Sequence, residues 1–382
     1  MRPTGMAEPD PVLIEELLST TFRSRVIVAG WQRMAPWSVA RCVLVHEAPA
    51  LPPTVVVKWL RSDLHGSRVD PRQLLTERAA LEFLAGIGLA VAPVLLASDP
   101  ATTALVLEDL SPRVPLYDLL DGEETPAATM GIAAFARALG LLAAGTAGRA
   151  ETYYERRRAL GPVDPASDRE GSIRDRWEQT AAISAALGVP VSGKVAAEMA
   201  GVLAALGDPG PFLALSNGDA AANNFLVRDD DGRIIDFEFA GFRHALLDAA
   251  CLHVPGPMWI TLPDPVRTGL EDVYRSTLCS GVPEAADDGV YGGAMAAAAV
   301  AAAIQRGASR FARVGRRPPG DGSRPQLIAT LESAARAADH HRSLPHLAGW
   351  CRALGETLRR RWPDANEALT RLAGDAAAWV RR

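Results

Sequence analysis

The sequence contains almost no lysine. Of its 40 basic residues only Lys58 and Lys194 are lysines, and all the others are arginines. An ammonium group is a compact point charge, so a position that remains lysine against this bias is a candidate for a specific role. A basic surplus is also missing, because the net charge is −5 and the pI is near 5.9. This balance argues against a nucleic-acid-binding protein, and we expect no nucleic-acid partner.

Cysteines are few, and long apolar runs are absent. The four cysteines are too far apart for a zinc or redox motif, which fits a reduced cytoplasmic setting. The N-terminal segment MRPTGMAEPD has no apolar stretch, so we expect no secretory signal. The longest apolar run, 294–304, has 11 residues and is too short to cross a bilayer. We therefore expect a cytoplasmic protein with no membrane partner.

Strand patterns dominate the first part of the chain, and helical patterns dominate the rest. The composition, with 48% apolar and 22% charged residues, is typical of a packed globular protein. The sequence predicts strands over 25–30, 38–45, 54–59, 91–97 and 104–107. It predicts helices over 11–20, 127–144, 173–187, 194–206, 262–277, 294–313, 325–338 and 347–361, with one more after Asp70 and a last one that runs to the C-terminus. We expect an α+β fold whose composition changes near residue 110.

The helix after Asp70 carries a carboxylate on its apolar face. Asp70 is a good N-cap, Pro71 suits the first helical position, and Gln73 occupies the capping-box position. Glu77 falls on the same face as Leu74, whereas Glu82 does not. A carboxylate that points into a core is costly unless it meets a cation. Lys58, at the end of the predicted strand 54–59, is the obvious partner.

A second polar group lies in the stretch 216–241. Asp219 is followed by Asn224 five residues later and by Asp236 twelve residues after that. Between Asn224 and Asp236, the pattern predicts a hairpin with strands over 225–227 and 233–237, and with Asp-Gly supplying the positive φ in its turn. A hairpin returns its two ends to each other, so we expect Asn224 and Asp236 to lie close together. Their oxygens suit a hard cation, and Asp219 suits a hydroxyl proton.

Phosphoryl transfer from a nucleotide explains all five polar residues. The sequence resembles the aminoglycoside phosphotransferase and choline kinase family of protein-kinase-like small-molecule kinases. That family's H-G-D-x-x-x-x-N loop corresponds to Asn217-Gly218-Asp219 with Asn224, and its I-D-[FW]-E motif corresponds to Ile235-Asp236-Phe237-Glu238. The segments VVVK at Lys58, ERAALEFL at Glu77 and LVLEDL before residue 111 match in order and spacing. The resemblance covers roughly residues 20–255.

The resemblance implies a bilobal fold in which the two lobes have different functions. The N-terminal lobe would span 1–108 and bind the nucleotide, and the helical lobe would span 109–382, with a hinge at about 108–113. Asp219 is similar to the family's catalytic base. The resemblance implies that Asn224 and Asp236 are Mg²⁺ ligands, and that Lys58, held by Glu77, binds the phosphates of ATP or GTP. The further residues expected to contact the nucleotide are Ser38, through its hydroxyl, and the hinge residues Glu108, Asp109 and Leu110.

Two departures from the family pattern concern the same site. Asn217 replaces the family's histidine, and we expect this to be tolerated because that residue is thought to brace the loop. The strand turn over 30–38 lacks the glycines that cradle phosphates. These departures leave an inactive kinase-like binding protein as an alternative. For an enzyme, the acceptor is a small hydroxylated molecule, plausibly an antibiotic, with sugars, choline-like compounds and amino alcohols as alternatives.

Several other polar features are interpreted as structural. The acidic run 229–231 predicts a turn and not a calcium loop. His340, His341 and His346 lack a supporting carboxylate pattern and are expected to be surface or core histidines. We expect Glu238 and Asp248 to support the structure or to position the loop, and not to take part directly in the chemistry. Tyr153, Tyr154 and Trp259 suit either an acceptor pocket or packing.

Overall fold

The computed structural model describes most of the 382 residues. The described residues are 8–34, 38–60, 70, 72–99, 103–120, 125–254, 264–314, 316–318, 320 and 322–370. Pro71, Trp259 and the helix expected at the C-terminus lie outside them. Within these ranges the chain forms two compact units. The first comprises Met1–Arg113, Glu151–Val163 and Arg233–Ala240, and the second comprises Val114–Ala150, Asp164–Gly232 and Gly241–Arg382. The lobe boundary expected at 108–113 stays a prediction.

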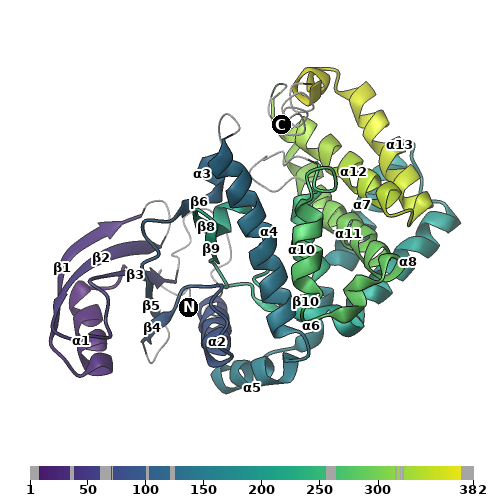
Figure 1. Ribbon diagram of the computed structural model, residues 1–382. Coiled ribbons are helices and arrows are strands. Elements are labelled where there is room, and N and C mark those ends of the chain that lie inside the picture. The colour runs from purple at the N-terminus through teal and green to yellow at the C-terminus, as the bar shows by residue number, and fades with distance from the viewer. Residues whose placement is uncertain are drawn as a thin grey trace. The chain divides into compact units, whose positions relative to one another are not determined.

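The first unit is built on an antiparallel sheet of five strands (Figure 1). Its elements are α1 (Pro11–Phe22), β1 (Val26–Arg33), β2 (Val39–His46), β3 (Thr54–Trp59), α2 (Arg72–Gly86), β4 (Leu95–Ser98), β5 (Ala104–Glu108) and α5 (Ala150–Leu160). The strand order is β1-β2-β3-β5-β4. Alternate residues of β2 and β3 are buried, as expected for strands with one face on a core. Helix α1 contributes Ile14 and Leu18 to that core.

Helix α5 was not predicted, and its tyrosines are packing residues. Tyr153 and Tyr154 are both buried, with exposures of 0% and 3%. The ring of Tyr153 contacts Phe83 of α2 edge-on, and its hydroxyl donates a hydrogen bond to the carbonyl of Ala240 at 3.0 Å. Of the two roles considered for these tyrosines, the structure therefore supports packing.

The second unit is mainly helical. Its longer helices are α4 (Pro126–Thr146), α7 (Ile173–Ala186), α8 (Gly193–Gly207), α10 (Leu270–Leu278), α11 (Asp288–Val314), α12 (Ser323–His340) and α13 (Pro345–Arg361). Its shorter elements are β6 (Val114–Pro115), α3 (Leu116–Leu120), α6 (Pro165–Glu170), η1 (Gly210–Phe212), β7 (Leu213–Ser216), η2 (Ala222–Asn224), β8 (Phe225–Arg228), β10 (Gly241–His244), α9 (Leu246–Ala249), η3 (Ala250–Leu252) and η4 (Pro283–Ala286). The predicted α+β fold, with strands first and helices after, is confirmed.

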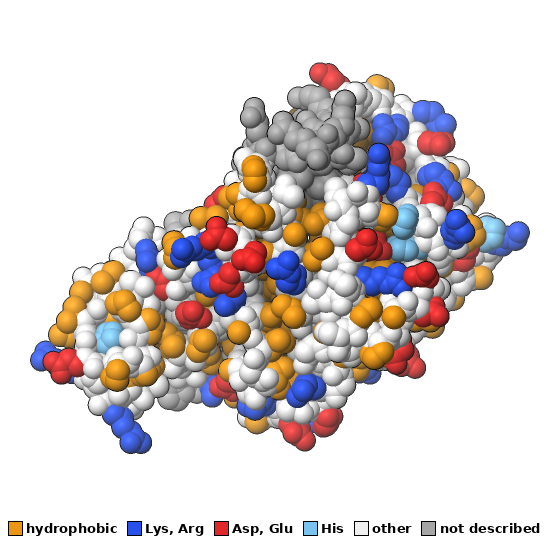
Figure 2. All heavy atoms as spheres, viewed as in Figure 1, with side chains coloured by type: hydrophobic (Ala, Val, Ile, Leu, Met, Phe, Trp, Pro, Cys, Tyr) orange, Lys and Arg blue, Asp and Glu red, His pale blue; other side chains and the backbone are white. Residues whose placement is uncertain are grey.

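The core of the second unit is formed largely by α11, α12 and α13, which pack together (Figure 1). The alanine-rich run 294–304 is buried in α11, as predicted. Helix α4 is long and apolar enough to cross a membrane, but 61% of its most apolar window is buried within the protein. On the face drawn in Figure 2, acidic and basic side chains are interspersed.

Two predicted helix starts were wrong. The helix expected from residue 262 begins at Leu270, because Gly269 adopts a left-handed conformation with φ +73° directly before it. The helix expected from residue 294 begins at Asp288, because the side chain of Asp287 accepts a hydrogen bond from the amide of Val290 at 2.8 Å. Both signals are local and lie outside the apolar pattern on which the predictions were based.

The hairpin predicted after Asn224 is present but shorter. Strand β9 (Asp231–Ile234) follows β8, and it ends before Phe237. The positive φ in the turn lies at Asp229 (+57°) and not at Gly232. Gly232 is needed for another reason, since a Cβ there would lie 1.9 Å from the Phe225 ring. The predicted proximity of Asn224 to Asp236 stays a prediction, because these residues belong to different units.

Candidate active site

Lys58 is fixed by the sheet of the first unit. It lies near the end of β3, opposite Val39 of β2 and Leu105 of β5. Its neighbours Val57 and Trp59 are buried in the core on one face, so the Lys58 side chain points to the other face. There it meets Glu77 of α2, whose carboxylate Oε2 lies 2.5 Å from Lys58 Nζ. The predicted ion pair is present.

Three carboxylates surround the Lys58 ammonium. Besides Glu77, Asp236 forms an ion pair with Lys58, and Glu238 Oε2 lies 3.2 Å from Lys58 Nζ. The four side chains are between 2% and 25% exposed. Three carboxylates thus surround a single ammonium group, so this poorly solvated cluster has more acidic than basic groups.

The charges in this cluster act on the pKa values of Lys58 and Glu77. Burial alone would lower the pKa of Lys58, but the charges of Glu77, Asp236 and Glu238 outweigh burial and raise it. Burial raises the pKa of Glu77, and the charge of Lys58 opposes that rise. Lys58 is therefore fully protonated at neutral pH.

Asp236 is held in an unusual backbone conformation. Its φ is +66°, in the left-handed region that non-glycine residues other than Asn and Asp rarely adopt. The neighbouring Phe237 is fully buried, and the amide of Ile234 donates to the carbonyl of Val91 at 2.8 Å. These anchors fix the segment on both sides of Asp236. Strain of this kind is typical of functional positions.

The carboxylates of this cluster suit a hard divalent cation. One oxygen from each of Glu77, Asp236 and Glu238 lies within 4.8 Å of the others. Mg²⁺ prefers such oxygen ligands and is usually bound through one or two carboxylates together with phosphates. The residues present therefore fit the expected ion at Asp236.

Asp219 lies in the second unit on a braced loop after β7. Strand β7 pairs with β10, and the loop leaves it at Ser216. Asn217 is fully buried, and its side chain accepts from the amide of Asp219 at 3.3 Å and donates to the carbonyl of Asp219 at 3.4 Å. Asn217 thus makes the bracing contacts expected of the residue that replaces the family's histidine.

Asn224 meets Asp219 directly. Its Nδ2 donates to the carboxylate Oδ2 of Asp219 at 3.1 Å and to the Asp219 carbonyl at 3.0 Å. Its Oδ1 accepts from Asn223 Nδ2 at 2.8 Å. An amide oxygen has two lone pairs, so this bond leaves one for a cation. The five-residue spacing therefore brings the two predicted residues together.

Asp248 supports the same loop from α9. Ser216 Oγ donates to Asp248 Oδ1 at 2.6 Å and accepts from the amide of Gly218 at 2.9 Å. Burial raises the pKa of Asp248 to about 6, while the Ser216 hydrogen bond and the charge of Arg243 oppose the rise. The predicted positioning role for Asp248 agrees with these contacts.

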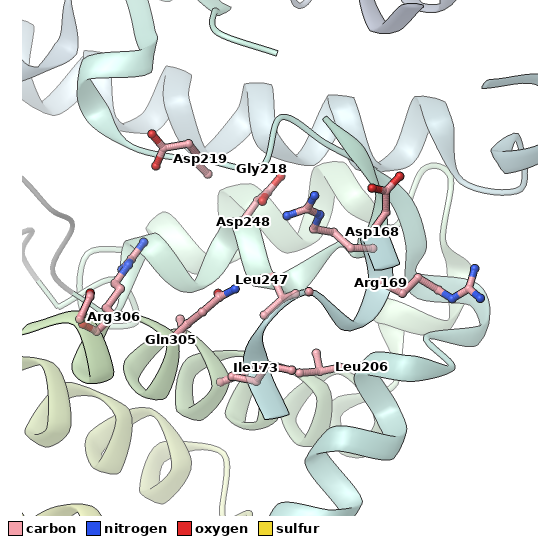
Figure 3. Close-up of a pocket in the computed structure, with 16 residues that line it drawn as sticks. Asp168, Arg169, Ile173, Leu206, Gly218, Asp219, Leu247, Asp248, Gln305 and Arg306 are labelled. Atoms are coloured by element: carbon pink, nitrogen blue, oxygen red, sulfur yellow. The ribbon is translucent and has the colours of Figure 1, made fainter. Parts of the chain in front are cut away.

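A cavity of about 280 Å³ opens beside Asp219 (Figure 3). Its lining comes from the Asp219 loop, from α6, from β10 and α9, and from α11. The polar lining residues are Asp168, Arg169, Asp219, Arg243, Asp248, Gln305, Arg306 and Ser309. Burial lowers the pKa of Arg306, and the negative charges of Asp219 and Asp248 oppose this effect. The cavity thus combines acidic and basic groups.

The remaining predicted residues all lie in the first unit. Ser38 and Lys58 line a small cavity of about 20 Å³ together with Glu238. At the expected hinge, the amide of Glu108 donates to the Val94 carbonyl at 2.9 Å, and the carbonyl of Leu110 accepts from the amide of Arg113 at 3.0 Å. The Asp109 side chain accepts from Arg41 Nε at 2.6 Å.

Glu238 belongs to the Lys58 cluster, a contact that was not predicted from the sequence. It was expected to support the loop, but it contacts Lys58 directly at 3.2 Å. The signal was its position two residues after Asp236, with the fully buried Phe237 between them.

Comparisons with solved structures gave distant likenesses. A choline/ethanolamine kinase family protein from Mesorhizobium loti is 14% identical, with a TM-score of 0.44 over 85% of this chain and 93% of that one. The choline kinase from Cryptosporidium parvum is 13% identical, with a TM-score of 0.42 over 89% and 91%. Aminoglycoside phosphotransferase APH(4)-Ia is 14% identical, with a TM-score of 0.45 over 91% and 99%.

No curated protein matches the chain in sequence. A family model does match: the model of the phosphotransferase enzyme family covers residues 56–288, more than half of the chain. The matched segment includes Lys58, Glu77, Asp219, Asn224 and Asp236. By this match the protein belongs to the phosphotransferase enzyme family.

Proposed function

We propose that this protein is an O-phosphotransferase that moves the γ-phosphate of ATP or GTP to a hydroxyl group of a small molecule. The observation that carries the proposal is the buried Lys58 ammonium among Glu77, Asp236 and Glu238, in a chain that matches a phosphotransferase family. A cation of this kind holds phosphate oxygens, and its carboxylate partner keeps it in place. The four free cysteines suit the cytoplasm as the place of the reaction.

The proposed reaction assigns one role to each group. The acceptor hydroxyl oxygen forms a bond to the γ-phosphorus, the bond from that phosphorus to the β–γ bridging oxygen breaks, and ADP or GDP leaves. Asp219 accepts the hydroxyl proton. Asn224 keeps the Asp219 carboxylate in orientation through the 3.1 Å hydrogen bond. Positioning and charge neutralisation supply most of the rate enhancement.

Asp236 and Asn224 are the proposed ligands of Mg²⁺. When bound, this ion neutralises the negative charge of the phosphates. The acidic surplus around Lys58 supports this assignment, because added positive charge relieves repulsion among the three carboxylates. We further assign Ser38 to the phosphates, and the backbone of Glu108, Asp109 and Leu110 to the purine.

The cavity beside Asp219 is the proposed acceptor site. Its volume of about 280 Å³ lies near the lower end for small-molecule sites. Its lining carries both acids and arginines, so hydroxyl, amino and carboxyl groups on one acceptor would all find partners. This favours a small polar metabolite, such as a sugar or an amino alcohol, as a second candidate beside an antibiotic.

The test is a transfer assay with γ-labelled ATP and GTP, Mg²⁺ and a panel of hydroxylated antibiotics, sugars, choline-like compounds and amino alcohols. Label on at least one acceptor is the expected result. A protein that binds nucleotide but labels no acceptor, and consumes none of the nucleotide, would support the inactive binding protein instead.

A further inference from the structure

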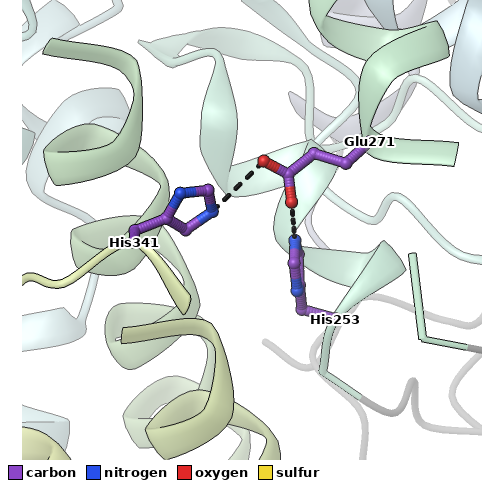
Figure 4. A group of neighbouring side chains, drawn as sticks. All are labelled: His253, Glu271 and His341. Atoms are coloured by element: carbon purple, nitrogen blue, oxygen red, sulfur yellow. Dashed lines mark ion pairs between the residues drawn. The ribbon is translucent and has the colours of Figure 1, made fainter. Parts of the chain in front are cut away.

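Two histidines and a glutamate from three separate segments meet inside the second unit (Figure 4). His253 follows η3, Glu271 lies in the first turn of α10, and His341 directly follows α12. Their side chains are only 6%, 8% and 9% exposed. None of them lines the cavity beside Asp219. The proposed phosphotransferase reaction gives these residues no role.

The three side chains point their ligand atoms at one another. His253 Nε2 lies 2.8 Å from Glu271 Oε2, and His341 Nε2 lies 3.1 Å from Glu271 Oε1. One donor atom from each residue falls within 4.8 Å of the other two. Figure 4 shows both rings directed at the same carboxylate.

Ion pairing brings these side chains together, but it leaves some of their polar atoms without a hydrogen bond. Among the described residues, His253 Nε2, His341 Nε2 and Glu271 Oε2 are buried atoms without a hydrogen-bond partner. Buried polar atoms without partners are rare, and an ion is one established explanation.

We propose that His253, Glu271 and His341 bind a divalent transition-metal ion of the zinc type. Two imidazole nitrogens and one carboxylate are a donor set that zinc uses, whereas Mg²⁺ and Ca²⁺ prefer oxygen alone. Bonds of about 2.0–2.1 Å in a tetrahedral site place neighbouring ligand atoms roughly 3.3 Å apart. The observed N···O distances of 2.8 and 3.1 Å, each to a different oxygen of Glu271, are close to this value.

The surroundings are built to hold the His341 ring. A Cβ at Gly292 of α11 would lie 3.1 Å from His341 Nδ1, so the glycine makes room for the imidazole. The ring of Tyr291 lies edge-on to His341 at a centroid distance of 6.1 Å. Three protein ligands leave one position of a tetrahedral ion for water or another small ligand. The ion would join the start of α10, the end of α12 and the segment after η3, and so stabilise the second unit.

Zinc binding to the full-length protein tests the proposal independently of any phosphotransferase activity. The protein is stripped with a chelator and titrated with zinc by calorimetry in excess Mg²⁺, which occupies the acidic cluster around Lys58. One equivalent of zinc is expected to bind and to raise the unfolding temperature. His253→Ala and Glu271→Gln should lose this equivalent. His340→Ala, which removes the adjacent exposed histidine, should keep it.

A second measurement does not depend on the variants folding. Co²⁺ added to the stripped wild-type protein should give the visible absorption of a nitrogen-ligated ion, and zinc should abolish it. A wild-type protein that binds no zinc in Mg²⁺, or gives no such absorption, overturns the proposal and leaves a charged His–Glu–His network. Retention of the zinc equivalent by folded His253→Ala and Glu271→Gln also overturns it.

Discussion

Lys58 Nζ lies 2.5 Å from Glu77 Oε2, and the Glu77 side chain is only 2% exposed. A lysine and a glutamate 19 positions apart in sequence thus form a buried ion pair between a strand and a helix of the first unit. Burying such a pair is costly, so its presence indicates a purpose other than stability. Two further carboxylates at the same ammonium reinforce that interpretation.

Glu77→Gln should weaken nucleotide binding and destabilise the fold by about 1–3 kcal/mol, because a buried hydrogen bond between two charged groups is replaced by one in which only Lys58 is charged. The matched control is Glu82→Gln on the same helix. Glu82 is 32% exposed and pairs with Arg78 four residues earlier, so the control should change stability by less than about 0.5 kcal/mol. Urea unfolding and nucleotide titration measure both effects. Equal behaviour of the two variants would contradict the proposed role of Glu77.

Lys58→Met should leave three carboxylates without their cation. We expect a loss of about 3–5 kcal/mol in unfolding free energy at pH 8. Burial already raises the pKa of Glu77, and without Lys58 that pKa rises further above its unfolded value. Stability is therefore greatest at low pH and is lost as the pH rises, so the variant should be less impaired at pH 5. Added Mg²⁺ should restore part of the loss at pH 8. A loss that responds neither to pH nor to Mg²⁺ would argue against a cation site.

Asp248 should make the wild-type protein less stable as the pH rises from about 4 to 6. Its pKa in the folded protein is about 6, above the ordinary value of 3.8, so the folded state binds the extra proton. This contribution is complete below pH 3.8, is lost as the pH rises through 6, and amounts to at most about 3 kcal/mol. Asp248→Asn should flatten the stability profile in that window. Chemical unfolding at pH 4, 5, 6 and 7 compares the two proteins, and an unchanged slope would refute the shift.

Gly232→Ala should destabilise the hairpin by about 1–3 kcal/mol, because the new methyl group would lie 1.9 Å from the Phe225 ring. Gly201→Ala is the control. Gly201 lies in helix α8 with no atom near its missing Cβ, so alanine should stabilise the protein by up to about 1 kcal/mol. Thermal unfolding of both variants measures the difference. A neutral Gly232→Ala would mean that the Phe225 ring can move aside.

Patterns within short stretches of sequence predicted a strand, the buried face of a helix and one contact in the candidate site. The β-branched run before Lys58 predicted β3, and the helical spacing from Leu74 placed Glu77 on the buried face. The five-residue spacing of Asp219 and Asn224 predicted their contact, which the structure contains. The catalytic and metal-binding roles of these residues stay predictions.

Other features depend on contacts that no local pattern encodes. His341 was interpreted as structural because His340, His341 and His346 lack a supporting carboxylate pattern, whereas Glu271, 70 positions earlier, is its neighbour in space. The cavity lining is likewise drawn from segments between Asp168 and Ser309. Tertiary packing determines which residues that are distant in sequence come into contact.

The rate of phosphate transfer in Asp219→Asn tests the proposed function most directly. With an acceptor that the panel identifies, we expect the variant to lose about 100-fold to 10,000-fold in rate, because it lacks the proton acceptor. Its unfolding free energy and nucleotide affinity should stay close to those of the wild type. Asp230→Asn, in the exposed hairpin turn, should retain the full rate. An undiminished rate in Asp219→Asn would contradict the assignment of Asp219 as the base.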